Sequence, residues 1–274
     1  MRFFSKNVVT VLGAGPAGLL AAHAAERAGR EVRILTMPEL DGTPKKSELH
    51  GCQYLHSFIP EITPDEGVRV NYRLDGSAEA YRRKVYGSSW NGTVSPDEYG
   101  PEEDHDAWDL REAYGKLWER WYDRIVGLDI TPSIASDIAY ARGHIVYSTI
   151  PARSVCLLPD EHRFFTQDVW AMGTREDAKP YWTLPYYAPN MTVQCNGNDG
   201  PRWYRAATVF GHSTLEWPMG VKPPVAGVVR VEKPLRTTCD CHLDSGRWHR
   251  LGRYGKWEKG VLADSAYLEA LVLK

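Results

Sequence analysis

The sequence has no long apolar run, and its number of cysteines is odd. No stretch approaches the roughly 20 apolar residues needed to span a bilayer, so we expect no membrane span. Five cysteines among 274 residues argue against a secreted disulfide framework and for a reducing compartment. The segment MRFFSKNVV leads directly into an apolar run, so we expect no secretory leader. These absences predict a cytoplasmic globular protein.

A strong excess of one charge is also missing, as are several catalytic motifs. The formal net charge is -2, so nucleic-acid binding would have to be local. Residues 230–259 carry eight bases against four acids and are the local candidate for phosphate contacts. No Walker loop, G-x-S-x-G elbow or H-E-x-x-H motif occurs, which counts against phosphoryl transfer, esterase and zinc-protease chemistry.

The clearest positive signal is VVTVLGAGPAGLLAAHAAERAGREVRILT, residues 8–36. Its first five residues are apolar or Thr, as in a parallel strand that is buried on both faces. Residues 16–27 are rich in Ala and Leu and end before Gly29, which predicts a helix with a glycine at its C-terminal end. Residues 32–35 predict a second strand. The segment is therefore one βαβ half-unit.

Gly13, Gly15 and Gly18 match G-x-G-x-x-G in the context that this motif requires. Gly13 permits a tight turn, Gly15 lets the backbone approach a pyrophosphate, and Gly18 lets the helix lie close to the strand. The free N–H groups and the positive dipole end of the helix favour a diphosphate. A dinucleotide site is predicted here.

Patterning predicts the remaining elements. Residues 37–64 are loop-like, residues 68–74 and 144–151 are strand-like, and residues 77–85 and 132–143 are helix-like. A longer helix is predicted where six apolar residues share one face at a spacing of three or four, namely Ala107, Leu110, Tyr114, Leu117, Trp121 and Ile125. Residues 160–235 predict short strands and turns, and a last helix begins near Val261.

The sequence GAGPAGLLAA resembles the FAD fingerprint of the glutathione-reductase-like flavoproteins. HIVYSTIP and GRYGKWEKGVLADSAY are similar to later motifs of the branch that contains amine oxidases, protoporphyrinogen oxidase and UDP-galactopyranose mutase. The three motifs occur in the order seen in that branch. The resemblance implies an α/β fold: a Rossmann-type FAD-binding domain with a parallel central sheet, plus a smaller α+β substrate or cap region.

The resemblance also implies which residues hold FAD. The pyrophosphate would lie on Gly13, Gly15, Pro16, Ala17 and Gly18. Gly252 and Arg253 would lie at the flavin end, and the helix after Gly260, beginning with Val261 and Leu262, would point its N-terminus at the flavin. The alternative is a C-terminal helix that only packs on the sheet, with a solvated Arg253.

Thr36 departs from the dinucleotide pattern, which usually places an acid there to bind the adenosine ribose. A hydroxyl supplies no charged bidentate acceptor. Weaker ribose binding, replacement by Glu39, or a different nucleotide all stay open. No arginine suited to a 2′-phosphate is present, since Arg33 lies within the strand.

The stretch SELHGCQYLH alternates residues that carry chemistry. In an extended strand Glu48, His50, Cys52, Tyr54 and His56 would all project from one face. In the branch that the sequence resembles, a Gly/His-containing segment at a comparable place lies near the flavin, so the resemblance implies that His50 and His56 are the acid/base residues, since histidine titrates near neutrality. Tyr54 lies between them. The alternative is that these are ordinary loop side chains.

The stretch TTCDCH contains metal-ligand types, but one intervening residue is too few for common zinc sites and a fourth ligand is missing. The sequence therefore predicts no metal site. NGNDGPRWYR and KPYWTLPYY set aromatics beside Arg or Lys, which suits either stacking on a flat or phosphate-bearing substrate, or a packed sheet face with extended cations.

The leading functional hypothesis is a small FAD-dependent enzyme, an oxidoreductase or flavin-dependent lyase. Residues 1–64 and 131–274 would form the FAD-binding domain with the aromatic β segment, and residues 65–130 an inserted cap. The resemblance implies an amine- or amino-acid-like substrate, including an amino-acid-modified thymine in DNA of the kind handled by phage base-hypermodification flavoproteins. The alternatives are an NAD(P)-dependent oxidoreductase and a non-catalytic dinucleotide-binding module.

Overall fold

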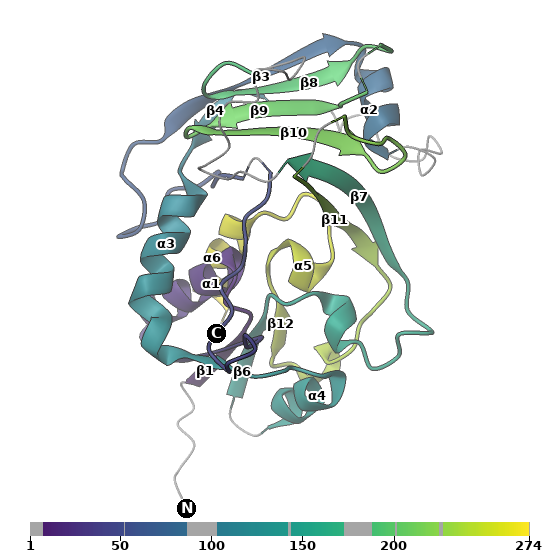
Figure 1. The fold of residues 1–274 in the computed structure, drawn as a ribbon. Helices are drawn as coiled ribbons and strands as arrows, with labels where there is room; N and C mark the ends of the chain where they lie inside the picture. Colours follow the sequence, from purple (N-terminus) through teal and green to yellow (C-terminus); the bar gives the residue numbers. More distant parts are fainter. Residues whose placement is uncertain are drawn as a thin grey trace, which may run out of the picture.

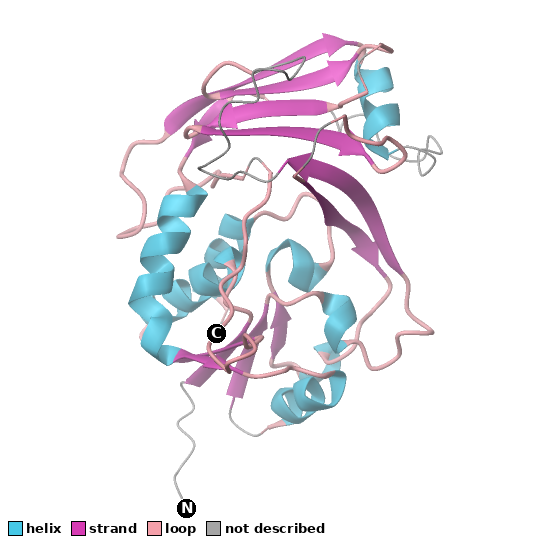
Figure 2. Cartoon of the chain, in the orientation of Figure 1, coloured by secondary structure: helices cyan, strands magenta, loops and turns pink. Residues whose placement is uncertain are grey.

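Two β-sheets organise the part of the chain that the computed structural model describes, which is residues 8–51, 53–86, 103–141, 144–172, 188–200, 202–224 and 227–273. The first sheet is entirely parallel, in the order β12-β6-β1-β2-β5 (Figures 1 and 2). Its strands are β1 (Val8–Leu12), β2 (Glu31–Thr36), β5 (Ile125–Gly127), β6 (His144–Ser148) and β12 (Trp248–Arg250). The predicted parallel central sheet is confirmed.

Helices cover both faces of the parallel sheet because both faces of its central strand are apolar. Val9 and Val11 of β1 pack with residues of three helices, and Leu12 packs on the opposite face against Ala135 and Ala139. The three helices on the first face are α1 (Pro16–Arg27), α3 (Leu110–Trp121) and α6 (Ala263–Val272). The helix on the second face is α4 (Pro132–Tyr140). The result is a three-layer α/β arrangement (Figure 1).

The second sheet has the order β11-β7-β10-β9-β8-β3-β4. Neighbouring strands are antiparallel except β3 and β8, which run parallel. Its strands are β3 (Val68–Gly76), β4 (His105–Ala107), β7 (Phe164–Met172), β8 (Thr192–Gly197), β9 (Arg205–Val209), β10 (His212–Pro218) and β11 (Val228–Thr237). Helix α2 (Ala78–Tyr86) lies beside it, and the short helix α5 (Gly252–Lys256) lies between this sheet and the parallel sheet (Figure 1).

The longest predicted helix is shorter in the structure. Ala107 ends β4 and Ile125 begins β5, so only the middle of the apolar series is helical. Asp109 sets the start, because its carboxylate accepts hydrogen bonds from the N–H groups of Arg111 and Glu112. The prediction of one helix through all six residues was wrong because side-chain spacing does not register a cap. The apolar side chains are buried all the same.

The two sheets group the chain differently from the predicted segments. Within residues 65–130, β3, α2 and β4 belong with the second sheet, whereas α3 and β5 belong with the parallel sheet. Strands β7 to β11 also belong to the second sheet. The whole stretch KPYWTLPYY lies outside the described residues, as does Cys52. Among the described helices, none has the length and apolarity to cross a lipid bilayer.

Candidate functional site

The glycine turn lies at the carboxyl end of β1, where the chain order of the sheet reverses between β2 on one side and β6 on the other. Gly13 has φ +100°, a left-handed conformation that favours glycine. A Cβ at Gly18 would lie 1.8 Å from the Gly13 carbonyl oxygen, so only glycine lets α1 start this close to the strand. In open α/β sheets this position is where ligands bind.

The N-terminus of α1 is free of acidic and capping groups. Gly15 is the N-cap residue and has extended backbone, and no side chain of the described residues caps the helix. Pro16 follows, and the first turn contains no acid. The first N–H groups and the positive dipole end of the helix therefore remain available to an anion.

Three segments that are distant in the sequence meet at this turn. The Thr149 hydroxyl after β6 donates a hydrogen bond of 2.9 Å to the carbonyl at the end of β1. A Cβ at Gly252 would lie 2.7 Å from the Cβ of Ala17, and a Cβ at Gly255 would lie 2.2 Å from the Ser148 carbonyl oxygen. The glycines of α5 thus let this helix sit directly against the start of α1 and the end of β6.

The long loop of residues 37–64 folds back over the turn through Tyr114 of α3. The Tyr114 hydroxyl donates to the Ala14 carbonyl at 2.9 Å and accepts from the Ser47 N–H at 3.0 Å. Ser47 lies against Gly15, since a Cβ added at Gly15 would be 3.3 Å from the Oγ of Ser47. The Lys46 ammonium lies 5.5 Å from the centre of the Tyr114 ring. Ser47 and Lys46 are not among the predicted site residues, although the segment KKS sets two lysines beside a serine in that loop.

The Thr36 side chain is buried and hydrogen-bonded to the glycine turn. It is 7% exposed, and its Oγ1 accepts from the Ala14 N–H at 3.4 Å. This contact ties the end of β2 to the glycine turn. Glu39 is exposed in the next turn, where its N–H donates to the Thr43 carbonyl at 2.7 Å. Glu39 is therefore an exposed acid just past the end of β2.

Arg253 is half-buried and hydrogen-bonded within the protein, so it is not the solvated side chain of the alternative. Its guanidinium donates to the Pro234 carbonyl in β11 at 3.1 and 3.3 Å, and burial lowers its pKa. It thus joins α5 to the second sheet. The other predicted residues of this segment lie near the start of α6: Gly260 has φ +84°, Val261 and Leu262 are half-buried, and Leu262 is the N-cap residue.

Arg253 belongs to a group that we call the cationic cluster: Arg205, Lys233 and Arg253 around Glu216. The Glu216 carboxylate is 2% exposed and accepts from Arg205 Nη2 and from Lys233 Nζ, each at 2.7 Å. Burial alone would raise the pKa of Glu216, but the two cations outweigh it and hold that pKa far below its usual range. Burial lowers the pKa of Lys233 to about 8 despite its carboxylate partner.

The cationic cluster contains more positive than negative groups. Three cationic side chains face a single carboxylate, and the buried Nε of Arg205 has no hydrogen-bond partner among the described residues. The Tyr204 hydroxyl also donates to Glu216. In NGNDGPRWYR, Tyr204 and Arg205 therefore belong to a buried charged group. This group lies between the second sheet and the loop of residues 37–64, since Gly51 packs against Glu216.

Tyr54 and His56 form a ring stack with residues of the second sheet. The His56 ring centre lies 4.9 Å from that of Tyr54 and 4.3 Å from that of His105 in β4. Tyr54 and Tyr72 share a hydrogen bond between their hydroxyls. His105 Nδ1 donates to the Glu103 carbonyl at 2.8 Å, so in neutral His105 the buried Nε2 carries the lone pair. His105 is far from His56 in the chain, so no local pattern predicts their contact.

His50 lies apart from this stack, so the expected alternation along one extended face was wrong. The segment is a loop, and Gly51 has φ +75°, which turns the chain between His50 and Tyr54. The His50 Nε2 lies 3.4 Å from the exposed Glu48 carboxylate. The structure therefore brings together two of the three predicted catalytic residues and places the third elsewhere.

His56 is also fixed to the start of α6. Its N–H donates to the Asp264 carboxylate at 3.2 Å, and Asp264 is buried in the first turn of that helix. The other carboxylate oxygen of Asp264 is buried without a hydrogen-bond partner among the described residues. The ring stack therefore meets the N-terminus of α6, the helix end that the resemblance in the sequence predicts to face a flavin.

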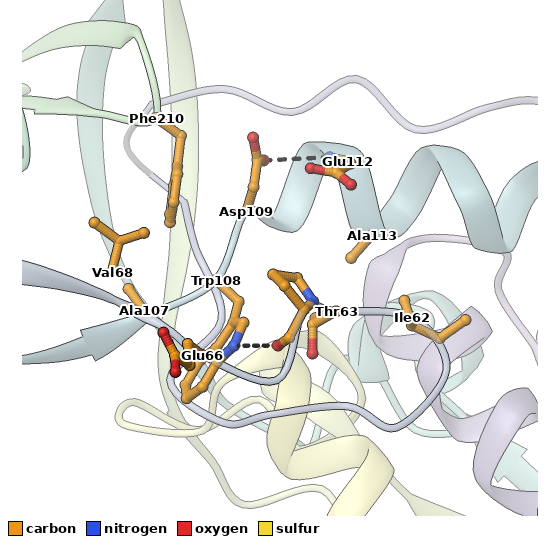
Figure 3. A pocket seen from close by; sticks show the side chains of 11 residues that line it. Ile62, Thr63, Glu66, Val68, Ala107, Trp108, Asp109, Glu112, Ala113 and Phe210 are labelled. Carbon is orange, nitrogen blue, oxygen red and sulfur yellow. Dashed lines mark hydrogen bonds between the residues drawn. The ribbon is translucent and has the colours of Figure 1, made fainter.

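A small cavity of about 230 Å³ lies elsewhere, between the start of α3 and the edge of the second sheet (Figure 3). Trp108 forms one wall, with its indole N–H donating to the Pro64 carbonyl at 2.9 Å, and Phe210 lies opposite Ala107 and Val68. It is smaller than the usual 300 Å³ or more of ligand pockets, and it touches neither the glycine turn nor the ring stack. We do not assign the cofactor to it.

The parallel sheet, the glycine turn and the gathered C-terminal segment define a Rossmann-type dinucleotide-binding fold with a second sheet. No family model matches the sequence, and no curated protein matches it either. Among solved structures, reduced UDP-galactopyranose mutase is similar over 97% of this chain and 92% of its own, with a TM-score of 0.55 and 12% identity.

A second similar structure is Klebsiella pneumoniae HpxO complexed with FAD and uric acid. It covers 98% of this chain and 79% of its own, with a TM-score of 0.51 and 14% identity. The chain therefore has the fold of FAD-binding Rossmann-type flavoproteins, and the predicted fold class is confirmed.

Proposed function

We propose that the chain is a small FAD-dependent enzyme. The observation that carries this proposal is the meeting of the glycine turn, Thr149 and Gly252 at an uncapped helix N-terminus. The residues fit the group: Gly15 leaves its Cβ space open on the side away from Ser47, and no acid competes with a diphosphate in the first turn of α1. Ser47 and Lys46 add a hydroxyl and a cation from the loop above.

Bound FAD would supply a ring that accepts or returns two electrons in exchange with a substrate carbon or nitrogen. The protein's own residues position and shield that exchange. The N–H groups of Ala17 and Gly18 would hold the diphosphate, and the Gly252 backbone fixes the start of α5 against Ala17. The α6 N-terminus, with its helix dipole, stabilises negative charge nearby, and Asp264 holds His56 in place there.

The ring stack is the proposed acid/base group. His105 Nε2 carries a lone pair in a buried position, and the centre of the His56 ring lies 4.3 Å from the centre of the His105 ring. Tyr54 and Tyr72 flank the two histidines and can share a proton between their hydroxyls. His50, which the sequence analysis also named, has Glu48 as its partner and would act only from outside this stack.

The cationic cluster supports a substrate that carries an anionic group. Its excess of positive groups and the unpartnered Nε of Arg205 suit a carboxylate or a phosphate. A carboxylate agrees with an amine- or amino-acid-like substrate, and a phosphate agrees with a modified nucleotide, including an amino-acid-modified thymine in DNA. We propose the amino-acid-like substrate as the class, with the nucleotide as its larger carrier.

The test begins with the purified full chain. We expect a yellow protein with flavin absorbance in the visible region, and mass spectrometry of the released ligand should identify FAD. Anaerobic addition of a candidate amino-acid substrate should bleach that absorbance. A colourless protein that binds added NAD(P) but refuses FAD would support the dehydrogenase alternative, and a yellow protein that no substrate bleaches would support a binding module.

Lys233 predicts how binding of an anion depends on pH. Because the pKa of Lys233 is lowered to about 8, the ammonium is present below that pH and lost above it. Affinity for acetate, whose charge is constant in this range, should fall about tenfold as the pH rises through that value. Competition titrations from neutral to alkaline pH would measure this.

The matched variants for this titration are Lys233→Met and Lys222→Met. The first should bind acetate weakly at every pH and show no step, whereas the second changes an exposed lysine and should keep the wild-type step. A step of unchanged size in Lys233→Met would remove Lys233 from the proposed anion site.

A further inference from the structure

Four potential metal ligands gather in the connections between the two sheets. Cys156 follows β6, His162 precedes β7, and Cys239 and Cys241 follow β11. Their ligand atoms all lie within 4.8 Å of one another, and we call this group the Cys3His cluster. Cys156 and Cys239 are buried, and the other two are half-buried. The proposed function uses none of them.

The separations within the Cys3His cluster match a tetrahedron around one ion. A zinc ion with Zn–S bonds near 2.3 Å keeps its sulfurs about 3.8 Å apart. Cys156 Sγ lies 3.9 Å from Cys241 Sγ and 3.2 Å from His162 Nδ1, and Cys241 Sγ lies 3.7 Å from the same nitrogen. A disulfide would need about 2.05 Å between the sulfurs. The three cysteines of the cluster are free thiols, as is Cys195 in β8.

The surroundings place hydrogen-bond donors on two of the sulfurs and orient the histidine ring toward the cluster. The Leu157 N–H donates to Cys241 Sγ at 3.4 Å, and the Arg250 guanidinium donates to Cys239 Sγ at 3.2 Å. His162 Nε2 faces the Asp240 carboxylate at 3.6 Å, which directs Nδ1 toward the sulfurs. A carboxylate behind a ligating histidine and N–H donors on thiolates are usual around zinc.

We propose that the Cys3His cluster binds one Zn²⁺ as a structural site. Zinc suits three thiolates and one imidazole in tetrahedral arrangement, and four protein ligands leave no position for a substrate. Binding would displace the thiol protons to solvent. The ion would join the β6-to-β7 connection to the β11-to-β12 connection, each of which links the parallel sheet to the second sheet.

The stretch TTCDCH predicts no metal site, because one residue separates Cys239 from Cys241 and a fourth ligand beside them and His242 is missing. Their partners Cys156 and His162 precede them by more than seventy residues, and β-strand pairing brings them together. Two ligands, Cys156 and His162, were therefore too far away in sequence to be recognised, and His242 of TTCDCH is not part of the cluster.

The test measures metal content in the full chain purified without chelators. Elemental analysis should find about one zinc per chain in the wild type. Cys239→Ser and Cys241→Ser should each lose most of it, while Cys195→Ser, which changes a buried thiol in β8, should retain it. Protein stripped with a chelator and given Co²⁺ alone should show the visible bands of tetrahedral cobalt thiolate.

Three results would overturn the proposal. These are wild-type protein without stoichiometric zinc that also gives no cobalt thiolate bands, a disulfide between cluster cysteines found by mass spectrometry, or zinc retained in both cluster variants. The wild-type measurements decide the question even where a variant does not fold. They are independent of FAD content and activity, so failure here leaves the proposed function standing.

Discussion

Replacing Gly15 with valine is expected to give a folded protein that does not retain FAD. Gly15 is the N-cap residue of α1 in extended backbone, a conformation that valine adopts without strain. A Cβ added there would meet only Ser47, whose Oγ would lie 3.3 Å away and is the end of a small rotatable group, so we expect folding to tolerate the change. The branched carbons would fill the space through which a diphosphate approaches the helix N–H groups.

Flavin absorbance after purification and far-UV circular dichroism would measure retention and folding together. The matched control is Gly115→Ala in α3, where an added Cβ meets no atom within 4 Å. That control should keep its FAD and gain about 0.5 to 1 kcal/mol in free energy of unfolding, since alanine favours the helix over glycine. Normal flavin content in Gly15→Val would contradict the assignment of the glycine turn.

Replacing Glu216 with alanine is expected to destabilise the chain by about 3 to 5 kcal/mol, the usual cost of leaving buried charges unpaired. Arg205 and Lys233 each donate to this carboxylate, and both would lose their nearest counter-charge. Denaturant unfolding monitored by tryptophan fluorescence would give the difference. Glu119→Ala on the exposed side of α3 is the control and should change the free energy of unfolding by less than about 0.5 kcal/mol.

The effect of Glu216→Ala should depend on pH in a defined direction. The pKa of Glu216 is lowered in the folded protein, so its contribution to stability is present above its ordinary pKa and lost as the pH falls toward the folded value. Wild type and variant should therefore differ most at neutral pH and converge in acid. A difference that stays below 1 kcal/mol at neutral pH, the level of an exposed ion pair, would show that the cluster is not buried as described.

Local patterns were sufficient for the first βαβ unit. The predicted bounds of β1 and α1 agree with the structure, because an apolar strand, a glycine turn and an Ala-rich helix are each specified by adjacent residues. Periodicity failed at Ala107 and Ile125, where strand pairing overrides helical spacing. It failed again at His50, because a single left-handed glycine turns the chain.

The sequence by itself therefore determined the first βαβ unit and the uncapped helix end after its glycine turn, whose causes lie within residues 8–36. Only the tertiary structure decided which distant groups meet. It placed Gly252 on Ala17, His105 beside His56, and Cys156 beside Cys241. The physical reason is that strand pairing and core packing act between residues far apart in the chain, and no local pattern of side chains records them.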